Sequence, residues 1–256
     1  MSADRANPWE PYWERFAVSA RANPAQAFRR RLIHALLGAG ASEPGAAILD
    51  IGCGSGDLLA ELGERYPRAA IAGVDFSHSG LAEARANLPR ALLVQSDLAA
   101  GAPKELNVWA THAVCSEVLE HVDAPKALLA AADACLRPGG RLVVTVPGGP
   151  MSAFDRHIGH QRHYTRRRIA SLLEEAGFEV ELAAAAGFPL FNPYRMIVML
   201  RGRRLIDDVR DSPGLLARSV MALFDRLLPR SLSDSPWGWQ IVAVGRKRPV
   251  SAARSP

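Results

Sequence analysis

The stretch from Ala46 to Val146 alternates short apolar runs with segments of helical periodicity, and this alternation constrains the fold more than any other feature. Strands that alternate with helices along a chain are typical of βαβ units and a parallel sheet. Leucine and alanine recur every three or four residues between the runs, which predicts amphipathic helices at 57–66, 79–88 and 125–137. The runs are nearly continuously apolar, as strands covered on both faces should be. They predict strands at 46–51, 69–75, 91–97, 108–116 and 141–147.

The second half of the chain predicts two more strands and an insertion. A helix over 164–177, with Thr165 as its cap and a glycine at its end, leads into a sixth strand at 178–185. The segment GWQIVAVGRKR (238–248) predicts a last strand. The insertion at 187–237 is too long for a simple connection, so it should contain helices of its own.

The two ends of the chain are assigned from their residue patterns. Trp9, Tyr12, Trp13 and Phe16 lie at helical spacing, so residues 1–45 are expected to form an N-terminal helical lid over the domain at 46–186. Ordinary packing onto that domain explains the aromatic stripe equally well. Residues 249–256 are expected to form a disordered tail.

Composition narrows the class of protein. The chain has 256 residues, 48% of them hydrophobic, which is enough for a sizeable core. Its start, MSADRANPWEPYWERF, lacks the basic and apolar regions of a secretory signal, so a cytoplasmic protein is expected. The cysteines are Cys53, Cys115 and Cys135, and their wide spacing indicates neither disulfides nor a zinc ribbon.

Charge is unevenly distributed and leaves several partners open. Residues 156–256 carry 17 Lys/Arg against 9 Asp/Glu, which fits nucleic acid, an anionic membrane, a phosphorylated substrate or a solvated surface. The insertion joins apolar runs to arginines, as in GFPLFNPYRMIVMLRGRR, so peripheral contact with the inner face of a membrane is one interpretation. A cover for the substrate or a dimer surface is the favoured one. A monomer or homodimer is expected, and nucleic acid is disfavoured because no RNA-binding module is recognised.

The string ILDIGCGSGDLL places three glycines, Gly52, Gly54 and Gly56, between a strand and a helix. Glycines there allow a tight turn and close approach of a ligand, and the N–H groups at the start of a helix favour an anionic group. The spacing is GxGxG rather than the GxGxxG of dinucleotide-binding proteins. Asp50 would repel a pyrophosphate but could accept a hydrogen bond from an ammonium group. A nucleoside cofactor that ends in an amino acid therefore fits best.

Acidic residues also end the next two strands. Asp75 in GVDFS is placed to bind both hydroxyls of a ribose, with Phe76 beside it as an apolar face for a purine. Asp97 in QSDL is placed to accept a hydrogen bond from an exocyclic amine, with Leu98 covering the ring. Because open parallel sheets bind ligands at the carboxyl ends of their strands, these acids predict one crevice.

Five strings in register over 46–147 resemble the S-adenosylmethionine-binding domain of class I methyltransferases: ILDIGCGSG, GVDFS, QSDL, CSEVLEHV and LRPGGRLVVTVP. The resemblance implies an α/β fold with a Rossmann-like, doubly wound sheet of seven strands, the last strand antiparallel between the fifth and sixth. It implies S-adenosylmethionine as the cofactor and methyl transfer at the carboxyl edge. Asp50 and the glycine loop, with Cys53 inside it, would hold the methionine end. The other cofactor-binding residues implied are Asp75, Phe76, Asp97, Leu98 and Ser116.

Acceptor chemistry is expected beyond the fourth and fifth strands. In GGPMSAFDRHIGHQRHYT, His157, His160 and His163 recur every third residue, and a GHxRxY pattern is common in methyltransferases that resemble this one. A histidine near an acceptor hydroxyl can act as general base, because its ordinary pKa is about 6.5. The catalytic candidates are His160, His121 and Glu117. A structural role at the sheet edge is the alternative for each.

Glu117, Glu120 and His121 also raise the question of a metal. If their segment is helical, the three share one face, and a downstream histidine would complete a divalent metal site. Similar ExxEH strings bind metal in ubiquinone-pathway O-methyltransferases and in small-RNA 2′-O-methyltransferases, and they also occur in methyltransferases without metal. The favoured expectation is no metal, with Glu117 lining the cofactor pocket and His121 beside the acceptor.

Three functions remain open. The favoured one is S-adenosylmethionine-dependent methylation of a small molecule at oxygen, with a lipid-linked or sugar-linked acceptor among the options. RNA methylation would use the basic C-terminal part. A catalytically silent scaffold that only binds the cofactor is the third.

Overall fold

The sheet of the computed structural model, which describes residues 23–201 and 215–249, has seven strands in the order β3-β2-β1-β4-β5-β7-β6. All strands but β7 run parallel to one another, and β7 lies antiparallel between β5 and β6. The fold expected from the sequence is confirmed. The strands are β1 (Ala47–Ile51), β2 (Ala70–Asp75), β3 (Leu92–Gln95), β4 (Ala110–Ser116), β5 (Leu136–Pro147), β6 (Phe178–Ala186) and β7 (Gln240–Lys247).

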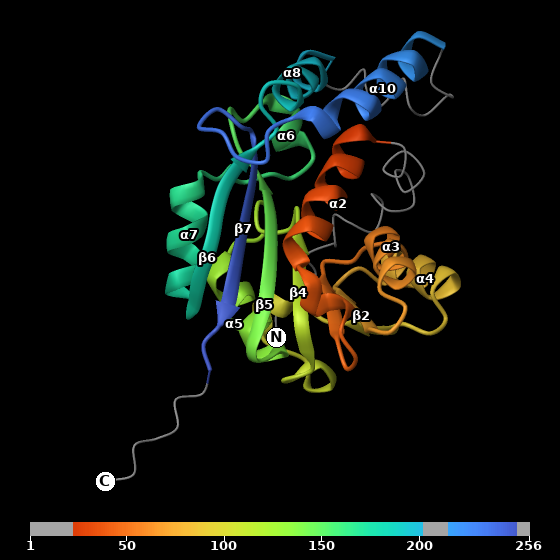
Figure 1. The fold of residues 1–256 in the computed structure, drawn as a ribbon, viewed down its shortest axis with the longest axis vertical. Coiled ribbons are helices and arrows are strands. Elements are labelled where there is room, and N and C mark those ends of the chain that lie inside the picture. Colours follow the sequence, from red (N-terminus) through yellow and green to blue (C-terminus); the bar gives the residue numbers. More distant parts are fainter. Residues whose placement is uncertain (1–22, 202–214, 250–256) are drawn as a thin grey trace.

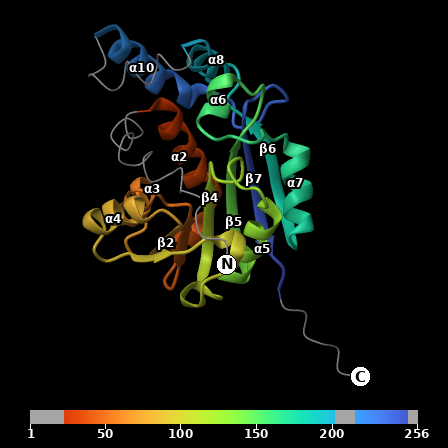
Figure 2. The same cartoon turned by 180° about the vertical axis from the view of Figure 1, so that it is seen from behind.

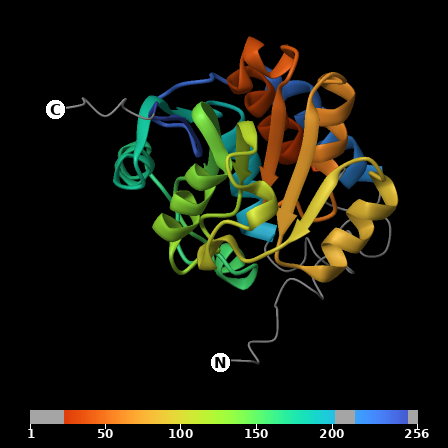
Figure 3. The ribbon, with the colours of Figure 1, turned by 90° about the horizontal axis from the view of Figure 1, so that it is seen from below.

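Helices cover both faces of the sheet, which is seen from below in Figure 3. On one face, apolar side chains of the helices α5 and α7 pack against strand residues in the largest core cluster. On the other face, α2 and α3 pack on β1, β4, β5 and β7, while α4 packs beside α3. The helices of these two layers are α2 (Pro24–Leu37), α3 (Asp57–Arg65), α4 (His78–Asn87), α5 (Pro125–Cys135) and α7 (Arg166–Glu175).

The insertion before the last strand is helical, as expected. It contains α8 (Phe191–Arg201), α10 (Leu215–Leu227) and a short 3₁₀ helix at Leu228–Arg230, while 202–214 lie outside the described residues. Figures 1 and 2 show α8 and α10 beyond the end of the sheet where β7 begins, next to the short helix α6 (Ala153–His157). This is the carboxyl end of the parallel strands, so the insertion is placed beside the edge where ligands bind.

Several local predictions can be compared with the structure. Thr165 is the cap of α7, since its hydroxyl accepts a hydrogen bond from the N–H of Arg168 at 3.2 Å. The fifth strand is longer than expected, because its first residues pair with the start of β4 across an irregularity between Ala110 and His112. The fourth strand is shorter than predicted, because Val108 has a left-handed backbone with φ of 51°.

The N-terminal region contains the helix α2 (Pro24–Leu37), which begins after the aromatic stripe and was not predicted from it. Asn23 caps α2 by accepting a hydrogen bond from the N–H of Ala25 at 2.9 Å, and Pro24 is its first residue. An asparagine followed by proline is a typical helix start. The aromatic stripe at Trp9 to Phe16 lies outside the described residues, so the N-terminal lid stays a prediction. The tail from residue 250 on also lies outside them, and its disorder stays a prediction too. Among the helices that the structure describes, none has the length and apolar character needed to cross a membrane.

Candidate functional site

The glycine loop turns back over the end of β1 with its backbone tied to the next strand. The N–H groups of Gly52 and Cys53 both donate to the carbonyl of Val74, at 2.8 and 3.2 Å. Gly52 has φ of 74°, and a Cβ there would lie 2.4 Å from the Cγ2 of Val118, so both backbone and space require glycine. The loop after β4 therefore lies directly on the glycine loop.

Cys53 is buried within this loop and packs with Leu59 and Leu81. Burial, with the nearby negative charge of Asp50, raises the pKa of its thiol well above the usual value. A thiol held in its neutral form is a poor nucleophile. Cys53 therefore fills space in the loop.

Two carboxylates face the loop from the ends of β1 and β2. Asp75 accepts hydrogen bonds from the N–H groups of Gly54 at 2.9 Å and Ser77 at 2.8 Å. Asp50 is buried, and its pKa is raised well above the usual value by burial and by the charge of Asp75. Two buried acids beside one cradle favour a ligand with a positive charge and hydroxyl groups, and S-adenosylmethionine fits both requirements.

The residues expected around the adenine differ in their exposure. Phe76 is 43% exposed beside Asp75, so its ring is available to a ligand. Asp97 is exposed, and one carboxylate oxygen accepts a hydrogen bond from the N–H of Ala99 at 2.9 Å as a helix cap. Leu98 is buried in the largest core cluster.

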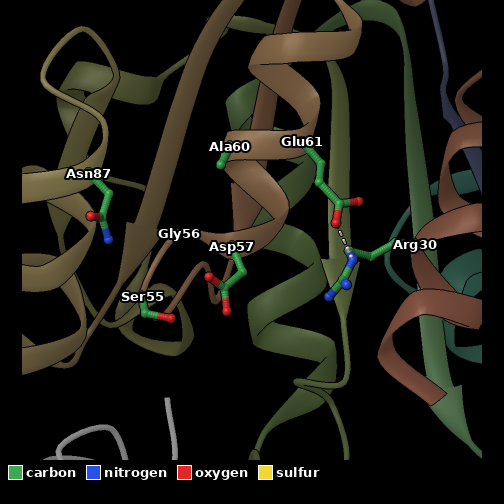
Figure 4. A pocket seen from close by; sticks show the side chains of 7 residues that line it. All are labelled: Arg30, Ser55, Gly56, Asp57, Ala60, Glu61 and Asn87. Carbon is green, nitrogen blue, oxygen red and sulfur yellow. Dashed lines mark ion pairs between the residues drawn. The ribbon is translucent and has the colours of Figure 1, made fainter. Parts of the chain in front are cut away.

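A cavity of about 340 Å³ opens on the outer side of the glycine loop (Figure 4). Ser55 and Gly56 line it from the loop, and Asn87 lines it from α4. On the opposite wall, Arg30 of α2 forms an ion pair with Glu61 of α3 at 2.6 Å. The cavity gives a ligand at the loop room between these helices.

The loop after β4 is not helical, contrary to the condition under which Glu117, Glu120 and His121 would share one face. It contains a bend and a turn, and Glu117 has φ of 56°. A left-handed backbone at a non-glycine residue is uncommon and costs about 1–3 kcal/mol, and such strained residues cluster at functional sites. The side chains of Glu117 and Glu120 consequently lie in different surroundings.

Glu117 lies at the end of β4 among residues from three other elements. Its Oε1 accepts hydrogen bonds from Thr145 of β5 at 3.2 Å and Gln240 of β7 at 2.9 Å. Its Oε2 lies 3.4 Å from the guanidinium of Arg29 on α2. Ser116, the preceding residue, shares a hydrogen bond of 2.8 Å with the same Thr145 hydroxyl. The carboxylate is thereby fixed at the carboxyl edge of the sheet.

Two of the three regularly spaced histidines come together. Nδ1 of His160 lies 3.2 Å from Nε2 of His163, and the ring of His160 meets that of His121 edge to face with centroids 4.7 Å apart. His157 is exposed and takes no part. Gln161 links the loop after α6 to the loop after β4, because its backbone N–H donates to the carbonyl of Glu120 at 2.8 Å. Tyr164 adds a hydrogen bond from its hydroxyl to the carbonyl of Leu119 at 3.0 Å.

Burial sets the protonation of these histidines. It lowers the pKa of His160 to about 3, helped by the neighbouring His121 and opposed by Asp155. Burial also lowers the pKa of His121. Both rings are therefore neutral near pH 7, and a group with a pKa near 3 is a weak general base.

Four residues that form polar contacts at the candidate site were not identified from the sequence: Arg29, Asp155, Arg195 and Gln240. Asp155 is fully buried, and Arg195 of α8 donates to it at 2.9 Å. Burial opposes the charge of Asp155, yet Arg195 and the N–H and hydroxyl of Ser152 hold its pKa below the usual value. A charge within an apolar run, such as Arg195 in NPYRMIVML, was the available signal. Gln240 carried no comparable signal.

Comparisons with known proteins agree with this geometry. A family model described as a methyltransferase domain matches residues 22–183, so the chain belongs to this family. Trans-aconitate 2-methyltransferase of Variovorax paradoxus (strain S110) is 26% identical over 257 aligned residues, which span 93% of this chain and 95% of that protein.

Solved structures share the fold at low sequence identity. Phosphoethanolamine N-methyltransferase 2 of Haemonchus contortus, in complex with S-adenosyl-L-methionine, has a TM-score of 0.58 and 16% identity, covering 86% of this chain and 52% of that one. The [4+2]-cyclase SpnF has a TM-score of 0.60 and 18% identity, covering 86% of this chain and 81% of that one. The protein is an S-adenosylmethionine-dependent methyltransferase with a Rossmann-like fold.

Proposed function

We propose that the protein transfers the methyl group of S-adenosylmethionine to a hydroxyl oxygen of a small molecule, and that Glu117 accepts the hydrogen of that hydroxyl. The observation that carries the proposal is the placement of Glu117. Its strained backbone lies at the end of β4, and the loop that follows it contacts the glycine loop through Val118. The cofactor loop and this carboxylate therefore share one edge of the sheet.

Arg29 and Arg195 are each paired with a carboxylate of the protein, and this favours a hydroxyl over a carboxylate as the methyl acceptor. The relative named above acts on trans-aconitate, a small tricarboxylate, and recognition of such a molecule requires cationic groups. Among the described residues at this edge, Arg29 faces Glu117 and Arg195 is bonded to Asp155. The other polar groups described above at this edge are carboxylates, imidazoles, hydroxyls and an amide, which suit an acceptor with hydroxyl groups. A sugar-linked or lipid-linked alcohol is compatible with this set.

S-adenosylmethionine supplies a methyl group that is already activated on a sulfonium. The chain then has to hold the acceptor in line and exclude water, and orientation alone supplies about 7–11 kcal/mol of barrier lowering. As the acceptor oxygen bonds to the methyl carbon, the carbon–sulfur bond breaks and its electron pair stays on sulfur. The proton of the hydroxyl passes to Oε2 of Glu117, the oxygen that faces Arg29 at 3.4 Å and is not bonded to Thr145 or Gln240. His160 and His121 would shape the site around the acceptor.

A labelled-methyl assay on fractionated cell extract tests the proposal, with mass spectrometry of the product. A methyl ether is stable to mild alkali, whereas a methyl ester is hydrolysed by it. Alkali-stable label at oxygen is expected. Alkali-labile label, label on nitrogen, or turnover of trans-aconitate at a comparable rate would overturn the choice of acceptor.

The same assay separates the two alternative functions. Label in RNA, with binding that weakens steeply as salt rises, would indicate RNA methylation. Binding of S-adenosylhomocysteine without transfer to any fraction would indicate a silent scaffold. SpnF, a cyclase with this fold, is a reminder that the fold alone does not specify methyl transfer.

A further inference from the structure

A cluster of one carboxylate and two imidazoles lies beside Glu117, between the loop after β4 and the loop after α6. Glu120, His121 and His160 each place one potential ligand atom within 4.8 Å of the others. Nε2 of His121 lies 3.9 Å from Oε1 of Glu120. The spacing leaves room for a small ion between the three side chains.

Glu120 is the unusual member of the cluster. Its side chain is fully buried, and neither carboxylate oxygen has a partner in hydrogen-bond geometry among the described residues. Buried carboxylates in proteins are normally paired or bound to a metal, because isolating the charge from water is strongly unfavourable. This carboxylate lacks the partner that its position requires.

The neighbouring imidazoles do not supply that partner by a hydrogen bond. Nε2 of His121 lies 3.9 Å from Oε1 of Glu120, which is too far for one. Imidazole nitrogens and carboxylate oxygens are both ligands of divalent transition metals. Two imidazoles and a carboxylate without a hydrogen-bond partner are complementary to a divalent cation.

Outer contacts hold His160 in the orientation that a ligand needs. Its Nδ1 lies 3.2 Å from His163 and 4.0 Å from the carboxylate of Asp155, which leaves Nε2 for the cluster. His163 is itself held by the carbonyl of Gly149, 3.2 Å from its Nδ1. Histidine ligands of metals are commonly oriented by a carboxylate or carbonyl in this way.

We propose that Glu120, His121 and His160 bind a divalent transition-metal cation. Two imidazoles and one carboxylate favour manganese, iron or zinc over magnesium, which prefers oxygen ligands. The sequence favoured the absence of a metal because the same ExxEH string occurs without one. The structure supplies what the string lacks, a third ligand from a distant loop and an unpartnered buried carboxylate. Glu117, bonded to Thr145 and Gln240, lies next to the cluster and outside the ligand set.

The test is direct metal binding by the full chain, with no acceptor or cofactor present. Protein stripped with a chelator is titrated with Mn²⁺ and, separately, with Zn²⁺ and Mg²⁺, and bound metal is measured by equilibrium dialysis with elemental analysis. One equivalent of Mn²⁺ or Zn²⁺ is expected, with much weaker binding of Mg²⁺. Because the assay involves no methyl transfer, its outcome is independent of the acceptor proposed above.

Three variants locate the site. Loss of an outer-shell carboxylate typically weakens metal binding about 10–100-fold, so Glu120→Gln and His121→Asn, which alter the ligands themselves, should weaken it at least as much. The matched control is His157→Ala, which removes an exposed histidine of the same segment and should bind metal as the parent does.

Thermal unfolding separates metal binding from a fold defect. Metal should raise the Tm of the parent and of His157→Ala but not that of Glu120→Gln. Without metal, Glu120→Gln should melt at or above the parent temperature, because it removes a buried charge. Absence of binding by the parent, or parent-like metal affinity in both Glu120→Gln and His121→Asn, would overturn the proposal. If Glu120→Gln does not fold, His121→Asn alone decides between these outcomes.

Discussion

The carboxyl edge of the sheet has two halves that are built in different ways. The proposed cofactor half consists of the glycine loop with Asp50 and Asp75, and the polar contacts described above for it all involve backbone groups. The proposed acceptor half, around Glu117 and Glu120, joins side chains from α2, α6, α8, β5 and β7. A site formed mainly by backbone conformation accepts few substitutions in sequence, and it suits a ligand that is always the same. A half made of distant side chains can vary with the acceptor.

If the two halves act separately, Glu117→Gln should have the largest effect of the variants compared. The effect should be confined to turnover. Loss of a general base typically lowers kcat about 10²–10⁴-fold. Affinity for S-adenosylhomocysteine should be unchanged, because Glu117 belongs to the acceptor half. Steady-state kinetics and calorimetry make the comparison, with the exposed Glu43→Gln as the control. Equal losses in kcat and in cofactor affinity would mean that the two halves are one site.

Asp75→Ala should show the opposite pattern, with a loss of cofactor binding. Each hydrogen bond to a charged group contributes about 1.5–3 kcal/mol, so losing both ribose hydroxyl contacts should weaken S-adenosylhomocysteine binding about 100-fold or more. The N–H groups of Gly54 and Ser77 also lose their acceptor, so the free energy of unfolding should fall by about 2 kcal/mol. Calorimetry and urea denaturation measure the two changes. An undiminished affinity would remove Asp75 from the cofactor site.

Asp50→Asn should change stability and binding in opposite directions. The pKa of Asp50 is raised in the folded state, so the folded protein holds its proton more tightly than the unfolded chain. The stability that Asp50 contributes is therefore lost as the pH rises from its pKa in the unfolded chain, about 3.9, through its pKa in the folded protein. The variant should melt at a higher temperature than the parent above that range. It should also bind S-adenosylhomocysteine more weakly, because the ammonium group loses its anion. Lower stability together with parent-like binding would contradict both roles.

Tyr164→Phe should have a modest effect confined to the acceptor half. The hydroxyl bonds the buried carbonyl of Leu119, and losing that bond should lower the free energy of unfolding by about 1–2 kcal/mol. Because Leu119 adjoins Glu120, kcat should fall while cofactor affinity is retained. Denaturation and kinetics of the same preparation test this. A loss of cofactor affinity instead would show that the loop after β4 couples the halves.

Asp97→Ala should have the smallest effect. Its carboxylate is exposed and caps a single turn by bonding the N–H of Ala99, a contact worth about 0.5–2 kcal/mol. Loss of the Asp97 carboxylate should weaken S-adenosylhomocysteine binding much less than Asp75→Ala does. The exocyclic amine of the adenine can donate its hydrogen bond to water instead. Calorimetry on the two variants in parallel gives the ratio. An effect as large as that of Asp75→Ala would place Asp97 at the centre of the cofactor site.

The sequence alone determined the fold class, and it predicted the residues of the proposed cofactor half. Apolar runs of strand length and the glycine loop are local patterns, and their meaning depends on residues adjacent in the chain. Gly52 was identified in this way, and its backbone conformation requires glycine. Element ends were less predictable, as at Val108 and Leu136, because pairing between β4 and β5 decides them.

The tertiary structure decided which partners the side chains of the proposed acceptor half have. Glu117 and Glu120 are three residues apart in one string, yet Glu117 is hydrogen-bonded to Thr145 and Gln240 while the carboxylate of Glu120 is buried without a hydrogen-bond partner among the described residues. Likewise His160 joins His121 and His163, whereas His157 stays exposed. Burial and partners across the chain set these differences, and no local pattern records them. The local pattern of one loop therefore predicts the methyl donor, while the proposed acceptor chemistry depends on side chains from segments that are distant in the sequence.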